Sequence, residues 1–219
     1  IGGHNICPCL QIIPVNLHQH LRMGHIPDTG QFSRLQTCLL QKALGSEYLV
    51  IEEGLSGRTT VFPDPLHESM SGLDLIYSCL MSHEPVDLLI IMLGTNDTKE
   101  RLGANAACIG IGMERLVAKA RSVEAWRDGR PNILVISPPH IGDGLLDNPV
   151  GRPMGHGCPE KSRELAAYYK QLAERQGVAF LDAEGIGEFN LLDCMHLTRR
   201  GHRRLAGKLA VLVPELLNR

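Results

Sequence analysis

The chain has 219 residues, of which 43% are hydrophobic, enough for one well-packed core and about one domain. Its 22 basic and 24 acidic residues give a formal charge of −2, so composition provides no electrostatic attraction to nucleic acid or to an anionic membrane. No apolar run approaches the roughly 20 residues that a membrane-spanning helix needs.

The seven cysteines are odd in number and widely scattered along the chain. This pattern favours reduced thiols over a disulfide framework, and reduced thiols favour a cytoplasmic location. The chain starts at Ile1 and not at a methionine, so a targeting segment ahead of it stays open.

Short apolar runs alternate with longer segments of helical periodicity. The predicted strands are 48–51, 86–93, 132–136 and 178–181. The predicted helices are 34–44, 71–81, 104–123, 159–175 and a last helix that begins after the N-cap Thr198. Because the runs are apolar on both faces, they are typical of buried parallel strands. The alternation predicts an α/β fold, a three-layer α/β/α sandwich.

One long segment, residues 137–158, shows neither pattern and is rich in proline and glycine. Loops of this length in a compact domain are commonly lids or binding loops. We expect this segment to cover the functional site or, alternatively, to form a contact between subunits.

A carboxylate and an imidazole lie three residues apart near the end of the chain, at Asp193 and His196. In acyl transfer a base takes the proton of the nucleophile, and a carboxylate fixes the tautomer of that base and stabilises its cation. A spacing of three brings both side chains together from one turn of chain. Taken alone the pattern is weak, because a surface turn capped by an aspartate has the same sequence.

Two further blocks come after predicted strands: Glu-Gly-Leu-Ser-Gly-Arg-Thr at residues 53–59 and Gly-Thr-Asn-Asp at residues 94–97. Active sites of parallel α/β sheets lie at the carboxyl ends of the strands. The amide of Asn96 can donate a hydrogen bond to the oxyanion of a tetrahedral intermediate. The alternative is an ordinary turn, because glycine, asparagine and aspartate are turn formers.

As a set, these three blocks resemble conserved blocks of the SGNH (GDSL-type) hydrolases, in particular the arylesterase/acyltransferase branch. Val-Ile-Ser-Pro-Pro at residues 135–139 is also similar to this family, and the likeness spans residues 45–215. The resemblance implies a single SGNH hydrolase-like domain over residues 1–219 with a flavodoxin-like parallel sheet of about five strands. It also implies a serine esterase or acyltransferase that acts on small esters through an acyl-enzyme.

The resemblance assigns roles to four residues. His196 is the base and then the acid, Asp193 orients it, and Asn96 and the backbone N–H of Gly57 form the oxyanion hole. Ser56 stands in this oxyanion loop and lacks the spacing of a nucleophile elbow, so it is a poor candidate nucleophile. The chemistry requires no cofactor and no metal. The expected partner is a small ester, with no nucleic acid and no membrane, and the Met- and Pro-rich loops are compatible with a homo-oligomer.

The fourth block of the family, a Gly-Asp-Ser with the nucleophile, is missing. Counting back from Leu40 and Gly45 places the expected serine within residues 13–20, which contain no Ser, Thr or Cys. One interpretation is a catalytically inactive relative that binds ester ligands. The other is that residues 1–30 are atypical because of a frame error: the codons for residues 21–24, read one base later, can encode Tyr-Gly-Trp-Gly, which resembles the segment after the nucleophile in the family.

Two other interpretations are weaker. The start of the chain holds soft metal ligands, but their spacing matches no common zinc site; they are His4, Cys7, Cys9, His18 and His20. A nucleotide- or flavin-binding role on the same architecture is disfavoured because no Gly-x-Gly-x-x-Gly comes after a predicted strand.

Overall fold

The computed structural model describes residues 9–13, 35–149 and 151–218, and within them five parallel strands form one sheet. The strands are β1 (Cys9–Ile13), β2 (Leu49–Glu52), β3 (Leu88–Ile91), β4 (Ile133–Ser137) and β5 (Ala179–Asp182). Their spatial order is β2-β1-β3-β4-β5, the flavodoxin-like order. The expected sheet of about five strands is therefore confirmed.

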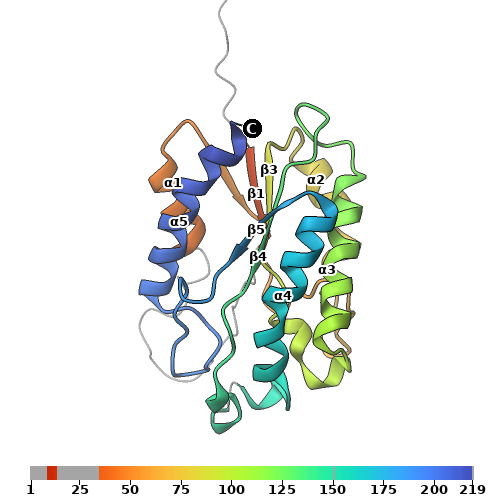
Figure 1. The fold of residues 1–219 in the computed structure, drawn as a ribbon, viewed down its shortest axis with the longest axis vertical. Helices are drawn as coiled ribbons and strands as arrows, with labels where there is room; N and C mark the ends of the chain where they lie inside the picture. The colour runs from red at the N-terminus through yellow and green to blue at the C-terminus, as the bar shows by residue number, and fades with distance from the viewer. Residues whose placement is uncertain (1–8, 14–34, 150, 219) are drawn as a thin grey trace, which may run out of the picture.

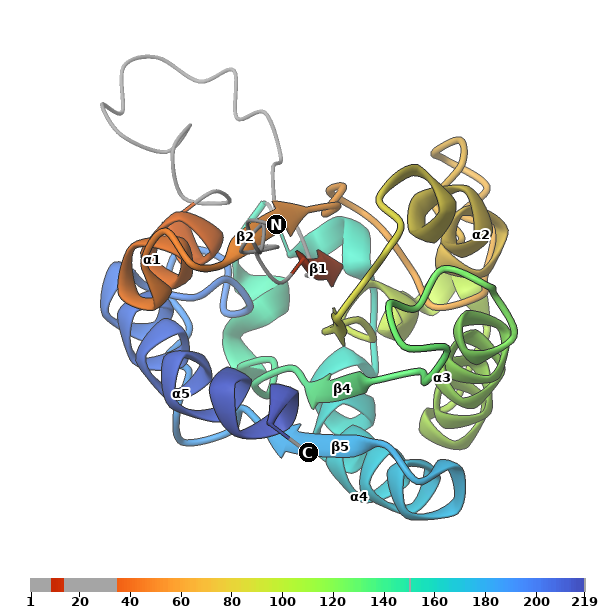
Figure 2. The ribbon, with the colours of Figure 1, turned by 90° about the horizontal axis from the view of Figure 1, so that it is seen from above.

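Helices cover both faces of the sheet. They are α1 (Leu35–Leu44), α2 (Gly72–Ser82), α3 (Ala106–Arg121), α4 (Cys158–Gln176) and α5 (Arg199–Leu217). Helices α1 and α5 lie on one face, and α2, α3 and α4 lie on the other (Figures 1 and 2). This arrangement confirms the predicted three-layer α/β/α sandwich.

Strand β3 shows why the apolar runs have no polar face. Leu89 and Ile91 belong to the core cluster under α2, α3 and α4, whereas Leu88 and Ile90 belong to the cluster under α1 and α5. All four side chains are fully buried. A strand covered on both faces buries every residue, so its sequence is continuously apolar.

The element boundaries lie within a few residues of those predicted. The predicted strand 86–93 is shorter in the structure, because Val86 forms an isolated bridge to Trp126 and the chain leaves the ladder before Gly94. Thr198 is confirmed as the N-cap of α5, since its side-chain oxygen accepts a hydrogen bond from the backbone N–H of Gly201 at 3.0 Å.

The segment 137–158 is packed, with two short 3₁₀ helices, η4 (Asp143–Asp147) and η5 (Arg152–Met154). It contributes to a small apolar cluster whose members are Ile141, Leu145, Met154, Cys158 and Met195. Met195 directly precedes His196, so this segment lies against the loop that holds the predicted base. A role in a contact between subunits stays a prediction.

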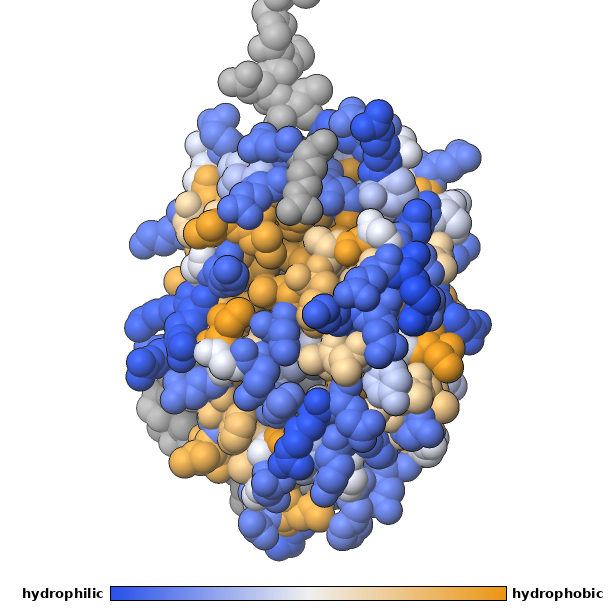
Figure 3. All heavy atoms as spheres, viewed as in Figure 1, coloured by the Kyte–Doolittle hydropathy of each residue, from blue (hydrophilic) through white to orange (hydrophobic). Residues whose placement is uncertain are grey.

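The surface near the open β5 edge of the sheet is partly apolar. Figure 3 shows apolar side chains gathered between the sides of the molecule formed by α5 and α4. Half-buried Phe180 and Leu181 of β5 pack against the two cores. None of the described helices is both long and apolar enough to span a bilayer.

Candidate active site

The predicted site residues come from loops at one end of the molecule. All strands of the sheet are parallel, so their carboxyl ends share one edge, which faces downward in Figure 1. The blocks 53–59 and 94–97 come directly after β2 and β3, and the 190–196 loop precedes α5 at the same end. The chain order reverses between β1 and β3, and sheets of this kind bind ligands at such a switch point.

Asp193 and His196 form a hydrogen-bonded pair. Asp193 Oδ2 accepts a hydrogen bond from His196 Nδ1, and Asp193 Oδ1 accepts from the backbone N–H groups of Met195 and His196 at 3.0 and 2.9 Å. The chain turns at Cys194, whose φ of 58° is in the left-handed region. Burial raises the pKa of the Asp193 carboxyl, but the hydrogen bonds and charge of its partners outweigh this and hold the pKa below its usual value.

Asn190 closes the loop around this pair, a role that sequence reasoning missed. Its side-chain oxygen accepts from the N–H groups of Leu192 and Asp193 at 2.8 and 3.1 Å. Its amide nitrogen donates to the backbone oxygen of His196 at 3.0 Å. The available signal was an asparagine three residues before the aspartate, since asparagine favours turns that bond their own backbone.

His196 Nε2, the nitrogen that a base would use, is buried and finds no hydrogen-bond partner among the described residues. The imidazole of His202, from α5, lies close by. Burial and the charge of His196 lower the pKa of His202 to about 4, so His202 is neutral at pH 7. The part of the chain that the structure describes contains no group of three side chains able to hold a metal ion.

Asn96 begins the short 3₁₀ helix η2 (Asn96–Thr98) that comes after β3. The residue is 5% exposed, and its amide nitrogen has no hydrogen-bond partner within the described chain. A buried amide donor without a partner is rare in folded proteins and is a candidate for binding a ligand oxygen.

Asp97, the next residue, ties this helix to the loop after β2. Its Oδ1 accepts hydrogen bonds from the backbone N–H and the hydroxyl of Thr60, at 2.8 and 2.5 Å. Burial raises the pKa of Asp97 to about 6, against the lowering effect of these bonds. Sequence reasoning placed Asp97 in the motif but gave it no role, because its partner is 37 residues away.

Gly57 has a φ of +90°, a backbone conformation that residues with a Cβ rarely adopt. A Cβ built there would come within 3.2 Å of the Met70 sulfur and 3.9 Å of Lys99 Nζ. Lys99 itself bonds Asp64 at 2.9 Å. The loop after β3 thus lies against the loop that carries Gly57.

The histidine loop and the Asn96 helix contact one apolar cluster. Met195 packs in the cluster that contains Cys158, and the Cys158 thiol donates to the backbone oxygen of Thr98 at 3.3 Å. The prediction that the nucleophile lies within residues 13–20 falls outside the described residues, apart from Ile13 at the end of β1. The cysteines and histidines at the start of the chain lie there too, except for Cys9 in β1.

The family model of the GDSL-like lipase/acylhydrolase family matches residues 27–204. The chain belongs to this family. The suggested SGNH resemblance is thereby confirmed, and with it the assignment of the chain as a carboxylic ester hydrolase.

Solved structures agree with this assignment. The aryl esterase of M. smegmatis is 31% identical with a TM-score of 0.81, and the match covers 95% of this chain and 99% of that chain. Est24, a carbohydrate acetylesterase from Sinorhizobium meliloti, is 30% identical with a TM-score of 0.83 and the same coverage. A lipase/acylhydrolase from Enterococcus faecalis shares the fold at 16% identity, with a TM-score of 0.65 and 95% and 96% coverage. Comparison with curated protein sequences finds no significant match.

Proposed function

We propose that this family member hydrolyses esters with a small acyl group through an acyl-enzyme, with His196 as base and then acid and Asp193 as the residue that orients it. The observation that carries the proposal is the asymmetry of the His196 ring. Its Nδ1 is bound to Asp193, while its Nε2 is buried without a partner among the described residues. That is the arrangement a catalytic base needs before substrate arrives.

The chemistry is a consequence of this asymmetry. The ionised Asp193 holds the proton on Nδ1, which leaves the Nε2 lone pair free to take a proton from an attacking hydroxyl. The cation that forms is stabilised by the carboxylate. His196 then gives the proton to the departing alcohol, whose C–O bond breaks to leave the acyl-enzyme. Water attacks this intermediate by the same route and releases the acid.

The proposed oxyanion donors are the amide of Asn96 and the backbone N–H of Gly57. The buried, unpartnered amide of Asn96 supports this role, and the Thr60–Asp97 bonds support a fixed position for it. A donor that is already oriented stabilises the developing charge without reorganisation, which contributes roughly 3–4 kcal/mol in a comparable site.

The substrate class rests on the relatives. One is called an aryl esterase and the other a carbohydrate acetylesterase, so a short acyl group with a variable alcohol is compatible with both. Leu191 and Leu192, exposed at 85% and 73% beside the Asp193–His196 pair, support contacts with an apolar ester. Transfer of the acyl group to an alcohol in place of water is an alternative fate of the same intermediate.

A second candidate is a catalytically inactive relative that binds ester ligands. The observation that favours it is the lack of Ser, Thr or Cys at residues 13–20, where the family carries its nucleophile. Without a nucleophile, only the residual catalysis of oxyanion stabilisation and binding would remain.

Hydrolysis of p-nitrophenyl acetate by the wild type, Asp193→Asn and His156→Ala tests the proposal. His156 lies outside the proposed catalytic pair and serves as the matched histidine control. The enzyme should turn over the ester, Asp193→Asn should lose most of kcat, and His156→Ala should be unchanged. Equal rates in all three proteins would overturn the assignment of the base and its partner.

A further inference from the structure

A cavity lies between the loop after β2 and helix α2, and neither Asp193 nor His196 lines it. Its volume is about 210 Å³, room for several waters or for a compact organic ion. Glu53 and Arg58 line it from the loop, and Leu75, Ser78, Cys79 and Ser82 line it from α2. Ser82 is exposed, so the cavity opens to solvent at the end of α2.

Arg58 is buried in the wall of this cavity, and no described carboxylate forms an ion pair with it. The residue is 8% exposed, and its Nε finds no hydrogen-bond partner among the described residues. Burial lowers the pKa of Arg58, and the nearby charge of Glu53 partly opposes this; the guanidinium remains charged because its pKa starts far above 7. A buried guanidinium N–H without an acceptor is unfavourable even with the charge of Glu53 nearby, so such a group is expected where a ligand supplies the missing acceptor.

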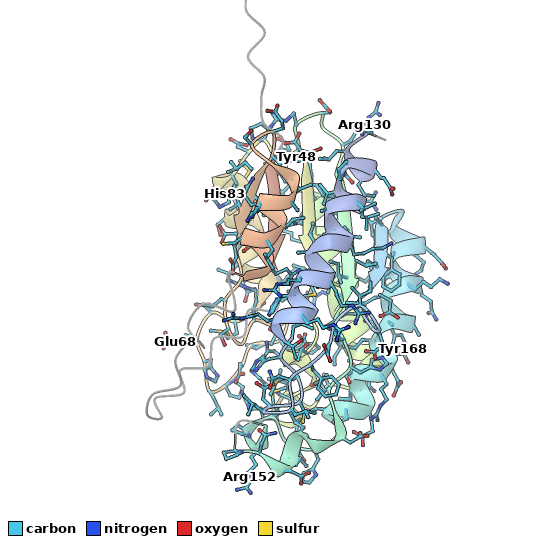
Figure 4. All side chains as sticks on the ribbon, turned by 90° about the vertical axis from the view of Figure 1, so that its left-hand side faces the viewer. Tyr48, Glu68, His83, Arg130, Arg152 and Tyr168 are labelled. Atoms are coloured by element: carbon cyan, nitrogen blue, oxygen red, sulfur yellow. The ribbon has the colours of Figure 1, made fainter. Side chains whose placement is uncertain are left out.

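The other polar groups of the cavity are already engaged. Glu53 Oε1 lies 2.5 Å from His83 Nε2, at the end of α2 (His83 is labelled in Figure 4). The hydroxyls of Ser78 and Ser82 donate to backbone oxygens within α2, at 3.0 and 2.7 Å. Burial and the nearby Glu53 raise the pKa of Cys79 to about 12, which keeps its thiol neutral. Arg58 Nε is therefore the buried lining donor that no described group satisfies.

We propose that this cavity binds a small oxyanion, a carboxylate or a phosphate, through the guanidinium of Arg58. The planar donor fork of arginine matches two oxygens of such a group. The apolar wall of α2 suits a short hydrocarbon remainder, and the serine oxygens can accept from a hydroxyl on it. Because Arg58 comes directly after Gly57, the bound ion also restrains the backbone of the proposed oxyanion loop.

Calorimetric titrations at constant ionic strength test the proposal, with acetate, benzoate and inorganic phosphate as separate ligands. The wild type should bind at least one of them saturably. Arg58→Gln should weaken that binding roughly tenfold or more, the loss expected for a charge-assisted hydrogen bond. Arg58→Lys keeps the charge but not the fork and should be intermediate. Arg130→Gln, at an exposed arginine labelled in Figure 4, should bind like the wild type.

Thermal unfolding gives a second readout. Arg58→Met should be at least as stable as the ligand-free wild type, because it removes a buried donor that has no acceptor among the described residues, and the ligand should raise the Tm of the wild type alone. Which of the three anions binds shows whether the natural ligand carries a carboxylate or a phosphate. Binding by His196→Ala should equal that of the wild type, so the result is independent of the catalytic proposal. The absence of saturable binding of all three ions, or equal affinity in Arg58→Gln, would overturn it.

Discussion

Two consecutive stretches of the chain, residues 88–93 and 94–99, are equally buried and chemically opposite. The first is wholly apolar and fills both cores. The second has five polar or charged residues, each at most 5% exposed: Thr95, Asn96, Asp97, Thr98 and Lys99. Burying polar groups is unfavourable unless they are bonded. The first stretch therefore supplies stability, and the second contains the proposed oxyanion donor Asn96.

The buried polar stretch is hydrogen-bonded at most of its side chains, and two buried side-chain atoms in it have no partner among the described residues. Asp97 is held by Thr60, Lys99 by Asp64, and the Thr98 hydroxyl donates to the backbone oxygen of Thr95 at 2.7 Å. These two atoms are Oδ2 of Asp97, an acceptor, and the amide nitrogen of Asn96, a donor. The satisfied groups fix the position of the unsatisfied donor.

The largest effect is expected at His196, the proposed base. His196→Ala should lower kcat for a short-chain ester by on the order of 10⁴-fold or more, because the mechanism relies on this imidazole to take the proton of the nucleophile. Steady-state kinetics would show this, with His156→Ala as the unchanged control. Retention of most of kcat in His196→Ala would remove the basis of the mechanism.

Asn96→Ala should show most clearly that the polar stretch affects activity more than stability. Activity should fall by roughly 10²–10³-fold, through the loss of one proposed oxyanion donor. The free energy of unfolding should stay the same or rise, because the substitution removes a buried donor that has no partner among the described residues. Kinetics and urea unfolding on the same samples measure both quantities. A large loss of stability with kcat unchanged would place Asn96 with the structural residues.

Ile90→Ala tests the opposite behaviour in the apolar stretch. The protein should lose about 2–5 kcal/mol of unfolding free energy, from lost burial of this fully buried side chain and the cavity left behind. The kcat of the folded protein should change little. Urea unfolding and an active-site titration of the folded fraction would check this, and a kcat loss as large as that of Asn96→Ala would blur the distinction between the stretches.

The raised pKa of Asp97 predicts how the free energy of unfolding depends on pH. Its pKa rises from 3.8 to about 6 on folding, so the folded protein binds the proton more tightly than the unfolded chain. This contribution is fully present below pH 3.8 and is lost as pH rises through about 6, a change of about 3 kcal/mol. Urea unfolding at pH 4 and 7 should show this loss relative to Asp97→Asn, which cannot titrate. Identical pH dependence in both proteins would contradict the shift.

The sequence was sufficient to predict the layers, because strands buried on both faces and amphipathic helices leave opposite periodicities in the chain. It also located Asp193 and His196, whose pairing is local. It could not predict what holds the site together. Thr60 reaches Asp97 across 37 residues, and Lys99 reaches Asp64 across 35, and such contacts leave no local pattern. The burial of Arg58 could not be predicted either, because it depends on how α2 packs beside the loop after β2.

The hypothesis of a frame error in residues 1–30 has its own test. Resequencing of the gene and the intact mass of the unmodified chain should both depart from the printed sequence if the nucleophile block was misread. A mass that matches the printed sequence would leave the inactive relative as the interpretation of the missing serine.

The most direct test of the central claim is intact-mass spectrometry after exposure to a serine-directed organophosphonate. The account predicts one covalent adduct per wild-type chain, formed far more slowly in His196→Ala, since Nε2 must take the proton before the oxygen can attack. No adduct on a wild-type chain of verified sequence would contradict an acyl-enzyme at this site.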